Sequence, residues 1–128
     1  MDATTLYLEQ TKSTPEVQFD KVNGVFSMIG KSSPLSAKKF FEPIIKEVVD
    51  FLNEGKALTS NFNLNYFNTP TSRYLYVLMR EFEAQNKLVE VNWYYEEEDE
   101  DMLETLEDFQ QIFDVTLNIK INEFELAH

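Results

Sequence analysis

The order in which alternating and helical segments follow each other most limits how this chain can fold. Residues 58–67 alternate apolar and polar side chains in the manner of a β-strand, and helical periodicity lies on both sides of them. A strand between two helices has no neighbouring strand in sequence to form a hairpin with, so it joins a sheet through crossover connections. The pattern therefore predicts a partly parallel sheet with helices packed on it.

The whole chain follows the order β-β-β-α-β-α-β-α-β, which predicts an α/β fold with a mixed sheet in one domain over residues 1–128. Strands are expected at residues 5–9, 16–20, 25–29, 58–67, 88–95 and 115–125, and helices at residues 36–53, 70–86 and 102–113. Asn23 and Gly24 predict a hairpin turn, because both residue types tolerate positive φ. Residues 31–35 are expected to form a loop.

Alternation in the strand at residues 58–67 assigns its side chains to two faces. The core face is predicted to hold Leu58, Ser60, Phe62, Leu64 and Tyr66. The opposite face is predicted to be rich in asparagine and to include Phe67.

The formal net charge of the chain is −12, from 23 acidic and 11 basic residues. This charge repels nucleic acid and anionic lipid, so neither is expected as a partner, and a basic partner surface fits better. No apolar run approaches the roughly 18 residues of a membrane span, and residues 1–10 contain no secretion signal. We therefore expect a cytoplasmic protein without membrane insertion.

Composition also excludes several classes of catalytic site. The sequence contains no cysteine, and its one histidine is the last residue, His128. Serine and cysteine hydrolase triads and histidine-ligated zinc sites are therefore not expected. None of the three glycines lies in a phosphate-binding motif. We expect a protein that is not an enzyme and has no catalytic residues, metal or cofactor.

The acidic run EEEDED at residues 96–101 is the densest charge cluster in the chain. A Mg²⁺ or Ca²⁺ loop needs spaced oxygen ligands and a sharply turning glycine, and no such glycine follows the run. The run is predicted to be a solvated loop that leads into a helix, whose N-terminus favours acidic residues. A contact for a basic partner and a carboxylate-based enzyme are the alternatives.

Two further segments have a structural and a functional interpretation. Trp93 is predicted to pack in the core on the same face as Tyr95, while Tyr94 on the opposite face is the better contact residue. Ser13 and Thr14 are predicted to form a turn before Pro15, with covalent modification as the alternative.

The junction between the strand at 58–67 and the next helix is crowded with hydroxyl and amide side chains. Pro70 suits the first helical position, which makes Thr69 the predicted N-cap, accepting from the backbone N–H near Ser72. The positive charge of Arg73 interacts unfavourably with the positive N-terminal end of the helix dipole, and an anion beside Arg73 would compensate for this. A phosphate on Thr69 would meet unpaired N–H groups at the positive helix end. The junction therefore predicts a phosphorylation switch in addition to a helix start.

These residues resemble the SiaC-like bacterial regulatory phosphoproteins, and the resemblance covers nearly the whole chain. It is based on the stretches STPEVQFD, GKSSP, FFEPII, LNYFNTPTSR, VNWYYEEEDEDM and EDF. The resemblance implies a fold similar to STAS-domain anti-sigma-factor antagonists and a role in partner switching. It also implies three partners: a serine/threonine kinase, a PP2C-type phosphatase, and a target bound by the unphosphorylated form. In the best-known branch that target is a diguanylate cyclase, an enzyme of c-di-GMP and biofilm control.

The resemblance implies that Thr69 is the phosphoacceptor. The recognition surface is then expected to consist of Tyr66, Phe67, Asn68, Thr71, Ser72 and Arg73, with Tyr66 and Phe67 positioning the strand end. The chain departs from the family pattern at Pro70 and Thr71, where serines are common, and at Leu106, where glycine is common. A constitutive interaction scaffold without phosphorylation is the alternative function.

Overall fold

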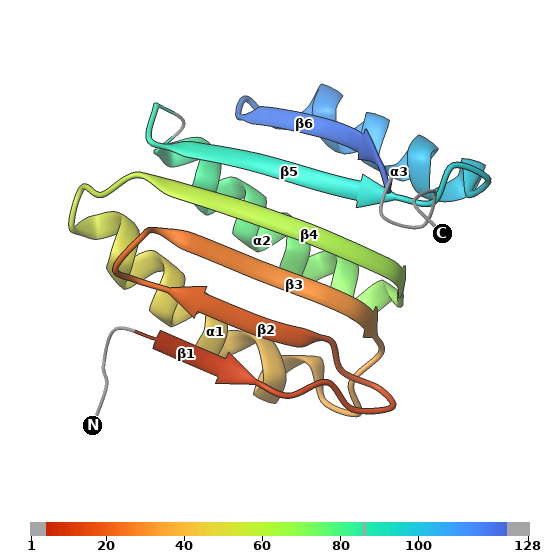
Figure 1. Cartoon of the computed structure of the whole chain (residues 1–128), viewed down its shortest axis with the longest axis horizontal. Helices are drawn as coiled ribbons and strands as arrows, with labels where there is room; N and C mark the ends of the chain where they lie inside the picture. Colours follow the sequence, from red (N-terminus) through yellow and green to blue (C-terminus); the bar gives the residue numbers. More distant parts are fainter. Residues whose placement is uncertain (1–4, 86, 123–128) are drawn as a thin grey trace.

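The computed structural model describes residues 5–85 and 87–122, which form one six-stranded sheet and three helices (Figure 1). The strands are β1 (Thr5–Leu8), β2 (Glu16–Asp20), β3 (Val25–Ser32), β4 (Leu58–Phe67), β5 (Val89–Tyr95) and β6 (Thr116–Ile121). The helices are α1 (Ala37–Asn53), α2 (Thr69–Ala84) and α3 (Glu100–Ile112). The predicted element order and the predicted α/β fold with a mixed sheet are confirmed.

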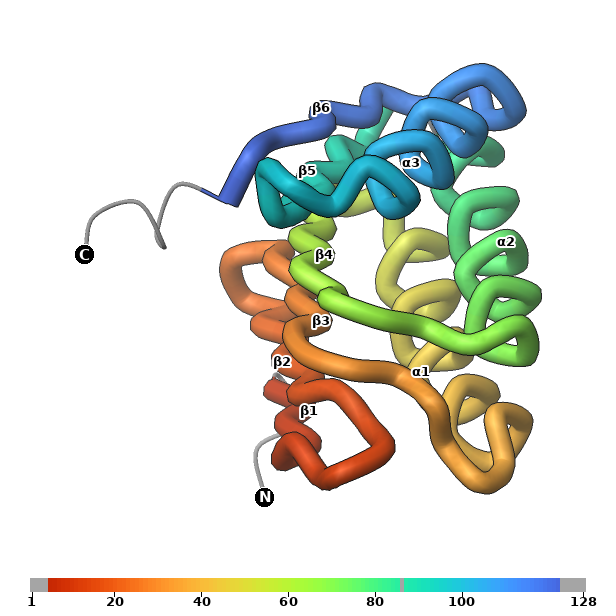
Figure 2. The backbone as a smooth tube through the Cα atoms, turned by 90° about the vertical axis from the view of Figure 1, so that its right-hand side faces the viewer, coloured from red at the N-terminus to blue at the C-terminus, as the bar shows by residue number. Residues whose placement is uncertain are grey.

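The strands lie in the sheet in the same order as in the sequence, β1-β2-β3-β4-β5-β6. The first three are antiparallel, and β3 to β6 are parallel and joined by the three helices. Each parallel connection moves one strand in the same direction, and such crossovers share one hand. All three helices therefore lie on one face of the sheet, and no helix of the described residues covers the other (Figure 2).

Four elements differ in extent from the prediction by two residues or more. Strand β3 continues to Ser32 through residues expected to form a loop, because Lys31 and Ser32 pair with Tyr66 and Phe67 of β4. Helix α3 begins at Glu100, inside the acidic run, because Asp99 caps it. Helix α2 ends at Ala84 with Gln85 as its C-cap, and strand β6 ends at Ile121, so both stop before the predicted Asn86 and Glu125. Asn86, Glu125 and His128 themselves lie outside the described residues.

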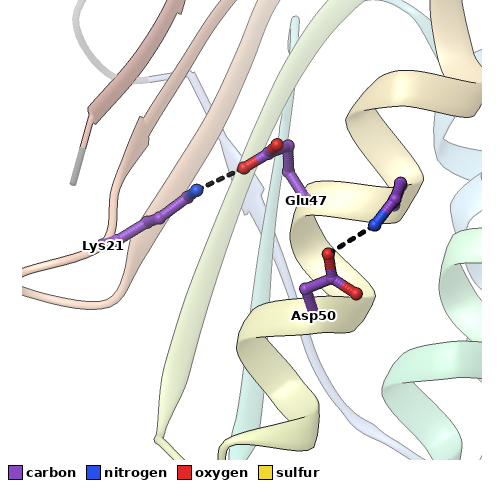
Figure 3. Close-up of polar contacts among 4 residues, drawn as sticks. Lys21, Glu47 and Asp50 are labelled. Atoms are coloured by element: carbon purple, nitrogen blue, oxygen red, sulfur yellow. Dashed lines mark hydrogen bonds and ion pairs between the residues drawn. The ribbon is translucent and has the colours of Figure 1, made fainter. Parts of the chain in front are cut away.

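The hairpin between β2 and β3 closes through a hydrogen bond from the Gly24 N–H to the Asp20 carbonyl (2.9 Å). Gly24 adopts a φ of 69°, a conformation that suits glycine. The predicted hairpin is confirmed. Lys21 in this turn forms an ion pair with Glu47 of α1, which ties the turn to the helix layer (Figure 3).

Aromatic rings form much of the core between the sheet and the helices. Phe62 of β4 stacks on Trp93 of β5 with ring centroids 4.4 Å apart, and Phe109 of α3 contacts Trp93 edge-on. Trp93 is fully buried, as predicted from its strand face. These contacts hold β4 and β5 on the helix layer and so fix the sheet edge at which α2 and α3 begin.

The uncovered face of the sheet has a row of asparagines across three neighbouring strands. Asn92 donates from Nδ2 to Asn61 Oδ1 (3.0 Å), and Asn118 donates to Asn92 Oδ1 (3.0 Å). Asn92 lies in the middle of this asparagine row and is only 6% exposed. The predicted asparagine-rich face of β4 is thus part of a hydrogen-bonded network.

Candidate functional site

The end of β4 departs from strict alternation at Asn65. Gly30 pairs with Leu64, but the next residue, Lys31, pairs with Tyr66, so Asn65 is an extra residue in β4. Such an insertion reverses the faces of the residues that follow it. Tyr66 is therefore 50% exposed and Phe67 is half-buried, which corrects the faces predicted for both.

Phe67 and Tyr66 have different surroundings after this reversal. The Phe67 ring lies 6.4 Å from that of Trp93 and packs against the core. The Tyr66 ring faces solvent, and the Lys31 ammonium lies 5.9 Å from its centre. Phe67 therefore anchors the strand end, while Tyr66 is presented at the surface next to the start of α2.

Asn68, and not Thr69, is the N-cap of α2. Its backbone is extended (φ −85°, ψ 176°), and its Oδ1 accepts from the Thr71 N–H at 3.0 Å. The prediction of Thr69 as the cap is wrong because asparagine caps at least as well as threonine, and the Asn68 N–H is held by the Ser32 carbonyl (3.1 Å). Thr69 is consequently the first helical residue and Pro70 the second.

Thr71 is fully buried. Its hydroxyl donates to the Ser32 carbonyl (3.2 Å) and lies 2.9 Å from the Ser32 hydroxyl. Thr71 was expected in the recognition surface, but its side chain points into the protein and links α2 to β3. Ser32, which sequence patterns did not single out, completes this link.

The remaining hydroxyls of the junction differ in accessibility. Ser72 is half-buried, and its Oγ donates to the Thr69 carbonyl at 2.7 Å. Thr69 is exposed, and its hydroxyl makes no hydrogen bond to any residue in the described ranges. Of the three hydroxyls at residues 69–72, that of Thr69 is the most accessible to a modifying enzyme.

Arg73 lies four residues after Thr69, so the two share one side of the helix. It is exposed and forms no ion pair within the described part of the chain. The backbone offers less to an anion than predicted, because Pro70 has no N–H and the Thr71 N–H is taken by Asn68. The Arg73 guanidinium is therefore the main group near Thr69 that can pair with a phosphate.

Comparison with known proteins decides the family. A family model described as "SiaC family regulatory phosphoprotein" matches residues 8–123. The chain belongs to this SiaC family. An uncharacterized protein of Pseudomonas aeruginosa (strain UCBPP-PA14) is 30% identical over 110 residues, which are 83% of this chain and 87% of that protein.

Solved structures of SiaC from Pseudomonas aeruginosa have the same fold as this SiaC-family chain. One is 26% identical with a TM-score of 0.84, and the match covers 92% of this chain and 98% of the other. Another is described as the diguanylate cyclase SiaD in complex with its activator SiaC, and the matched chain is 27% identical with a TM-score of 0.87. That match covers 91% of this chain and 99% of the other.

The other segments considered from the sequence have structural roles in this SiaC-family chain. Asp99 of the acidic run accepts from the Met102 N–H (3.0 Å), and no group of three or more potential metal ligands occurs within residues 5–85 and 87–122. The Thr14 N–H donates to the Thr11 hydroxyl (3.0 Å) and the Thr11 N–H to the Thr14 carbonyl (3.0 Å), which confirms the predicted turn before β2. Within the same ranges, no helix is both long and apolar enough to span a bilayer.

A hollow of about 840 Å³ lies on the uncovered face of the sheet. It is open, and its lining includes Tyr94, Lys120 and Ile121. The Lys120 ammonium lies 5.8 Å from the centre of the half-buried Tyr94 ring, so this predicted contact residue faces the hollow. Asn61 of the asparagine row also lines it.

Proposed function

We propose that this chain is a partner switch controlled by phosphorylation of Thr69. A serine/threonine kinase adds the phosphate and a PP2C-type phosphatase removes it. The unphosphorylated chain binds and regulates a target protein, for which a diguanylate cyclase is the proposed candidate. The chain acts by binding, without catalysis of its own, as a single regulatory domain over residues 1–128.

The observation that supports this proposal is the difference in accessibility among the three hydroxyls. Thr71 is buried and bonded to Ser32, and Ser72 is held by the Thr69 carbonyl, whereas Thr69 is exposed and unbonded. The chain belongs to a family of regulatory phosphoproteins, and an accessible hydroxyl such as that of Thr69 is suited to phosphorylation. Arg73 lies one helical turn away, where it can pair with the phosphate.

The proposed target is supported by a related protein. The solved complex described as SiaD with its activator SiaC contains a chain with the same fold and 27% identity to this one. By analogy, we infer that this chain regulates a diguanylate cyclase of its own organism through direct binding.

Mass spectrometry tests the modification. Intact protein purified from its native cells should contain a species heavier by about 80 Da, and PP2C treatment should remove it. Fragmentation should place the phosphate on Thr69. A native sample without this species under any growth condition would instead favour a constitutive scaffold.

Binding measurements test the switch. Purified Thr69→Ala should bind the diguanylate cyclase as wild type does, whereas Thr69→Glu should lose binding. Thr116→Ala serves as the matched control at an exposed threonine of β6, outside the candidate site, and should bind normally. Thr69→Glu should not lower the melting temperature, because a negative charge near a helix N-terminus is stabilising by about 0.3–1 kcal/mol. Equal binding by Thr69→Ala and Thr69→Glu would contradict the proposal.

A further inference from the structure

The two edge strands of the sheet differ in how well they are protected against pairing with another chain. Strand β6 contains Lys120, and Gln110 of α3 donates from Nε2 to the Leu117 carbonyl of that strand (3.3 Å). Strand β1 has the sequence TLYL, with neither a charged residue nor a proline, and no side chain of the described residues bonds to its backbone. Charged side chains, proline and covering groups are the usual protection of an edge strand, and β1 lacks all three.

One side of β1 has no neighbouring strand. β1 lies first in the sheet order, and β2 is its one partner among the described strands (Figure 1). The backbone N–H and C=O groups on its outer side are therefore available to a further strand. When a strand adds to such an edge, main-chain hydrogen bonds supply the affinity and neighbouring side-chain pockets supply the specificity.

A mainly apolar groove of about 430 Å³ lies beside this edge, between β1 and α1. Leu6 and Leu8 line it from β1, because their side chains face the helix layer, as those of their buried partners on β2 do. The apolar residues that line it from α1 are Phe40, Pro43 and Ile44. A strand added to β1 would place every second side chain on the face of the sheet that carries this groove.

The charge around this groove is nearly balanced, unlike that of the whole chain. Glu47, which lines the groove, forms an ion pair with Lys21 (Figure 3). Glu9 and Lys39 also line it, and neither forms an ion pair among the described residues. A net charge of −12 makes two copies of the chain repel each other over most of their surface. At the β1 edge, with one free acidic and one free basic side chain, this repulsion is weakest.

We propose that β1 pairs with β1 of a second copy of this chain, antiparallel around a two-fold axis perpendicular to the sheet. The two six-stranded sheets then become one continuous sheet, and the helices of both copies lie on the same face of it. An interface around a two-fold axis must be self-complementary. The β1 edge meets this condition, because each copy supplies the same free backbone groups, the same apolar groove and both signs of charge.

The two faces of β1 restrict the register of this pair. Residues directly opposite each other in an antiparallel pair have their side chains on the same face of the sheet. Leu6 and Leu8 face α1, whereas Tyr7 faces the other way, where its hydroxyl donates to Glu16 (3.1 Å). An axis between residues 6 and 7 would bring different faces together and is excluded. An axis through Tyr7 places Leu6 opposite Leu8 of the second copy and so joins the leucines of both copies.

Sedimentation equilibrium of the purified full chain tests for the dimer. Two strands of four residues and their grooves form a small interface, so we expect a reversible dimer at high protein concentration. The average mass should rise from 15.1 kDa toward twice that value as the concentration increases. A mass that stays at 15.1 kDa up to about 1 mM, the Kd of a very weak complex, would overturn the inference.

Cross-linking through an introduced cysteine locates the axis. The sequence contains no cysteine, so Tyr7→Cys supplies the one thiol of the chain. Opposed residues of an antiparallel pair have Cα atoms about 4.5–5.5 Å apart, within the range of about 4.4–6.8 Å that a disulfide needs. Mild oxidation should therefore cross-link Tyr7→Cys at least about tenfold faster than Thr116→Cys, at an exposed position of β6. Equal rates for the two variants would contradict pairing through β1.

Charge reversal in the groove has a matched control on the same helix. Lys39→Glu leaves only acidic free side chains at the groove and should weaken the dimer several-fold. Lys38→Glu changes the net charge by the same amount at an exposed position outside the groove lining, and should weaken the dimer less than about twofold. Equal effects of the two variants would show that net charge alone governs association, against the inference.

The dimer does not depend on the proposed switch. Strands β2 and β3 lie between β1 and β4, the strand that leads to Thr69. Thr69→Glu should therefore sediment as wild type does, even though it is expected to lose its target. A Thr69→Glu chain that remains monomeric where wild type dimerises would contradict an interface at the β1 edge.

Discussion

The hydroxyls of Ser32 and Thr71 lie 2.9 Å apart in fully buried positions, although 39 residues separate them in the sequence. Because the Thr71 hydroxyl donates to the Ser32 carbonyl, the Ser32 hydroxyl is the donor in the contact between the two. This pair fixes the first turn of α2 against the end of β3 and leaves Thr69 facing outward.

Loss of the Thr71 hydroxyl should destabilise the fold. Thr71→Val keeps the shape of the side chain but leaves the buried Ser32 hydroxyl without its partner, so unfolding free energy should fall by about 1–3 kcal/mol. Thr71→Ser keeps the hydroxyl and should cost less. Denaturant titration measures both, and equal stability of wild type and Thr71→Val would show that the hydrogen bonds contribute nothing.

The cap assignment predicts an order of stabilities. Asn68→Ala removes the acceptor for the Thr71 N–H and should cost about 1 kcal/mol. Thr69→Ala removes an unbonded exposed hydroxyl and should change stability by less than about 0.5 kcal/mol. Thermal or chemical unfolding measures the stability of both variants. A larger loss of stability in Thr69→Ala than in Asn68→Ala would contradict the assignment.

Acid sensitivity should depend partly on Glu83. The Asp114 backbone N–H and the Arg80 guanidinium bond to its carboxylate and hold its pKa below the ordinary value. A folded-state pKa below the unfolded one contributes stability above the unfolded pKa, and this stability is lost as pH falls through the folded pKa. Glu83→Gln should therefore lose less stability than wild type between neutral pH and pH values below about 4. Parallel pH profiles for the two proteins would contradict this role.

Gly24 and Gly55 provide a matched pair for testing a close backbone approach. Both have positive φ, 69° and 77°, but a Cβ on Gly24 would lie 2.4 Å from the Ala57 carbonyl oxygen, whereas one on Gly55 would meet nothing within 4 Å. Gly55→Ala should cost about 1–2 kcal/mol from backbone strain alone. Gly24→Ala should cost clearly more, because the hairpin must also move away from residue 57. Similar unfolding free energies for the two variants would contradict the close approach.

Local patterns predicted most of the fold because the helices and strands follow regular periods. The alternation of β4 held from Leu58 to Leu64, and the helical periodicity before it ended at Asn53 as in the structure. The alternation failed at Asn65, because the extra residue arises from pairing with β3 and has no local signal. The same pairing extends β3 to Ser32.

The location of the candidate site stays a prediction from the sequence, and the structure corrects the arrangement of its side chains. Asn68 and Thr69 are both good N-cap residues, and the choice between them depends on Ser32, which lies on another strand. The burial of Thr71 depends on the same residue. Ser32 was missed because the parallel pairing of β3 with β4, and not any motif, brings it to Asn68 and Thr71.

The asparagine row on the uncovered face of the sheet has a consequence for how the chain folds. Asn61, Asn92 and Asn118 form hydrogen bonds to one another only when β4, β5 and β6 are paired in the observed register. A slip of one residue would separate these amides and turn Asn92 toward the helix layer in place of Val91 or Trp93. The apolar alternation also disfavours a slip of one residue, but not a slip of two, which keeps every side chain on its own face. The asparagine row therefore adds its hydrogen bonds to the apolar core in selecting the observed register, because a misaligned sheet would leave these amides without their partners.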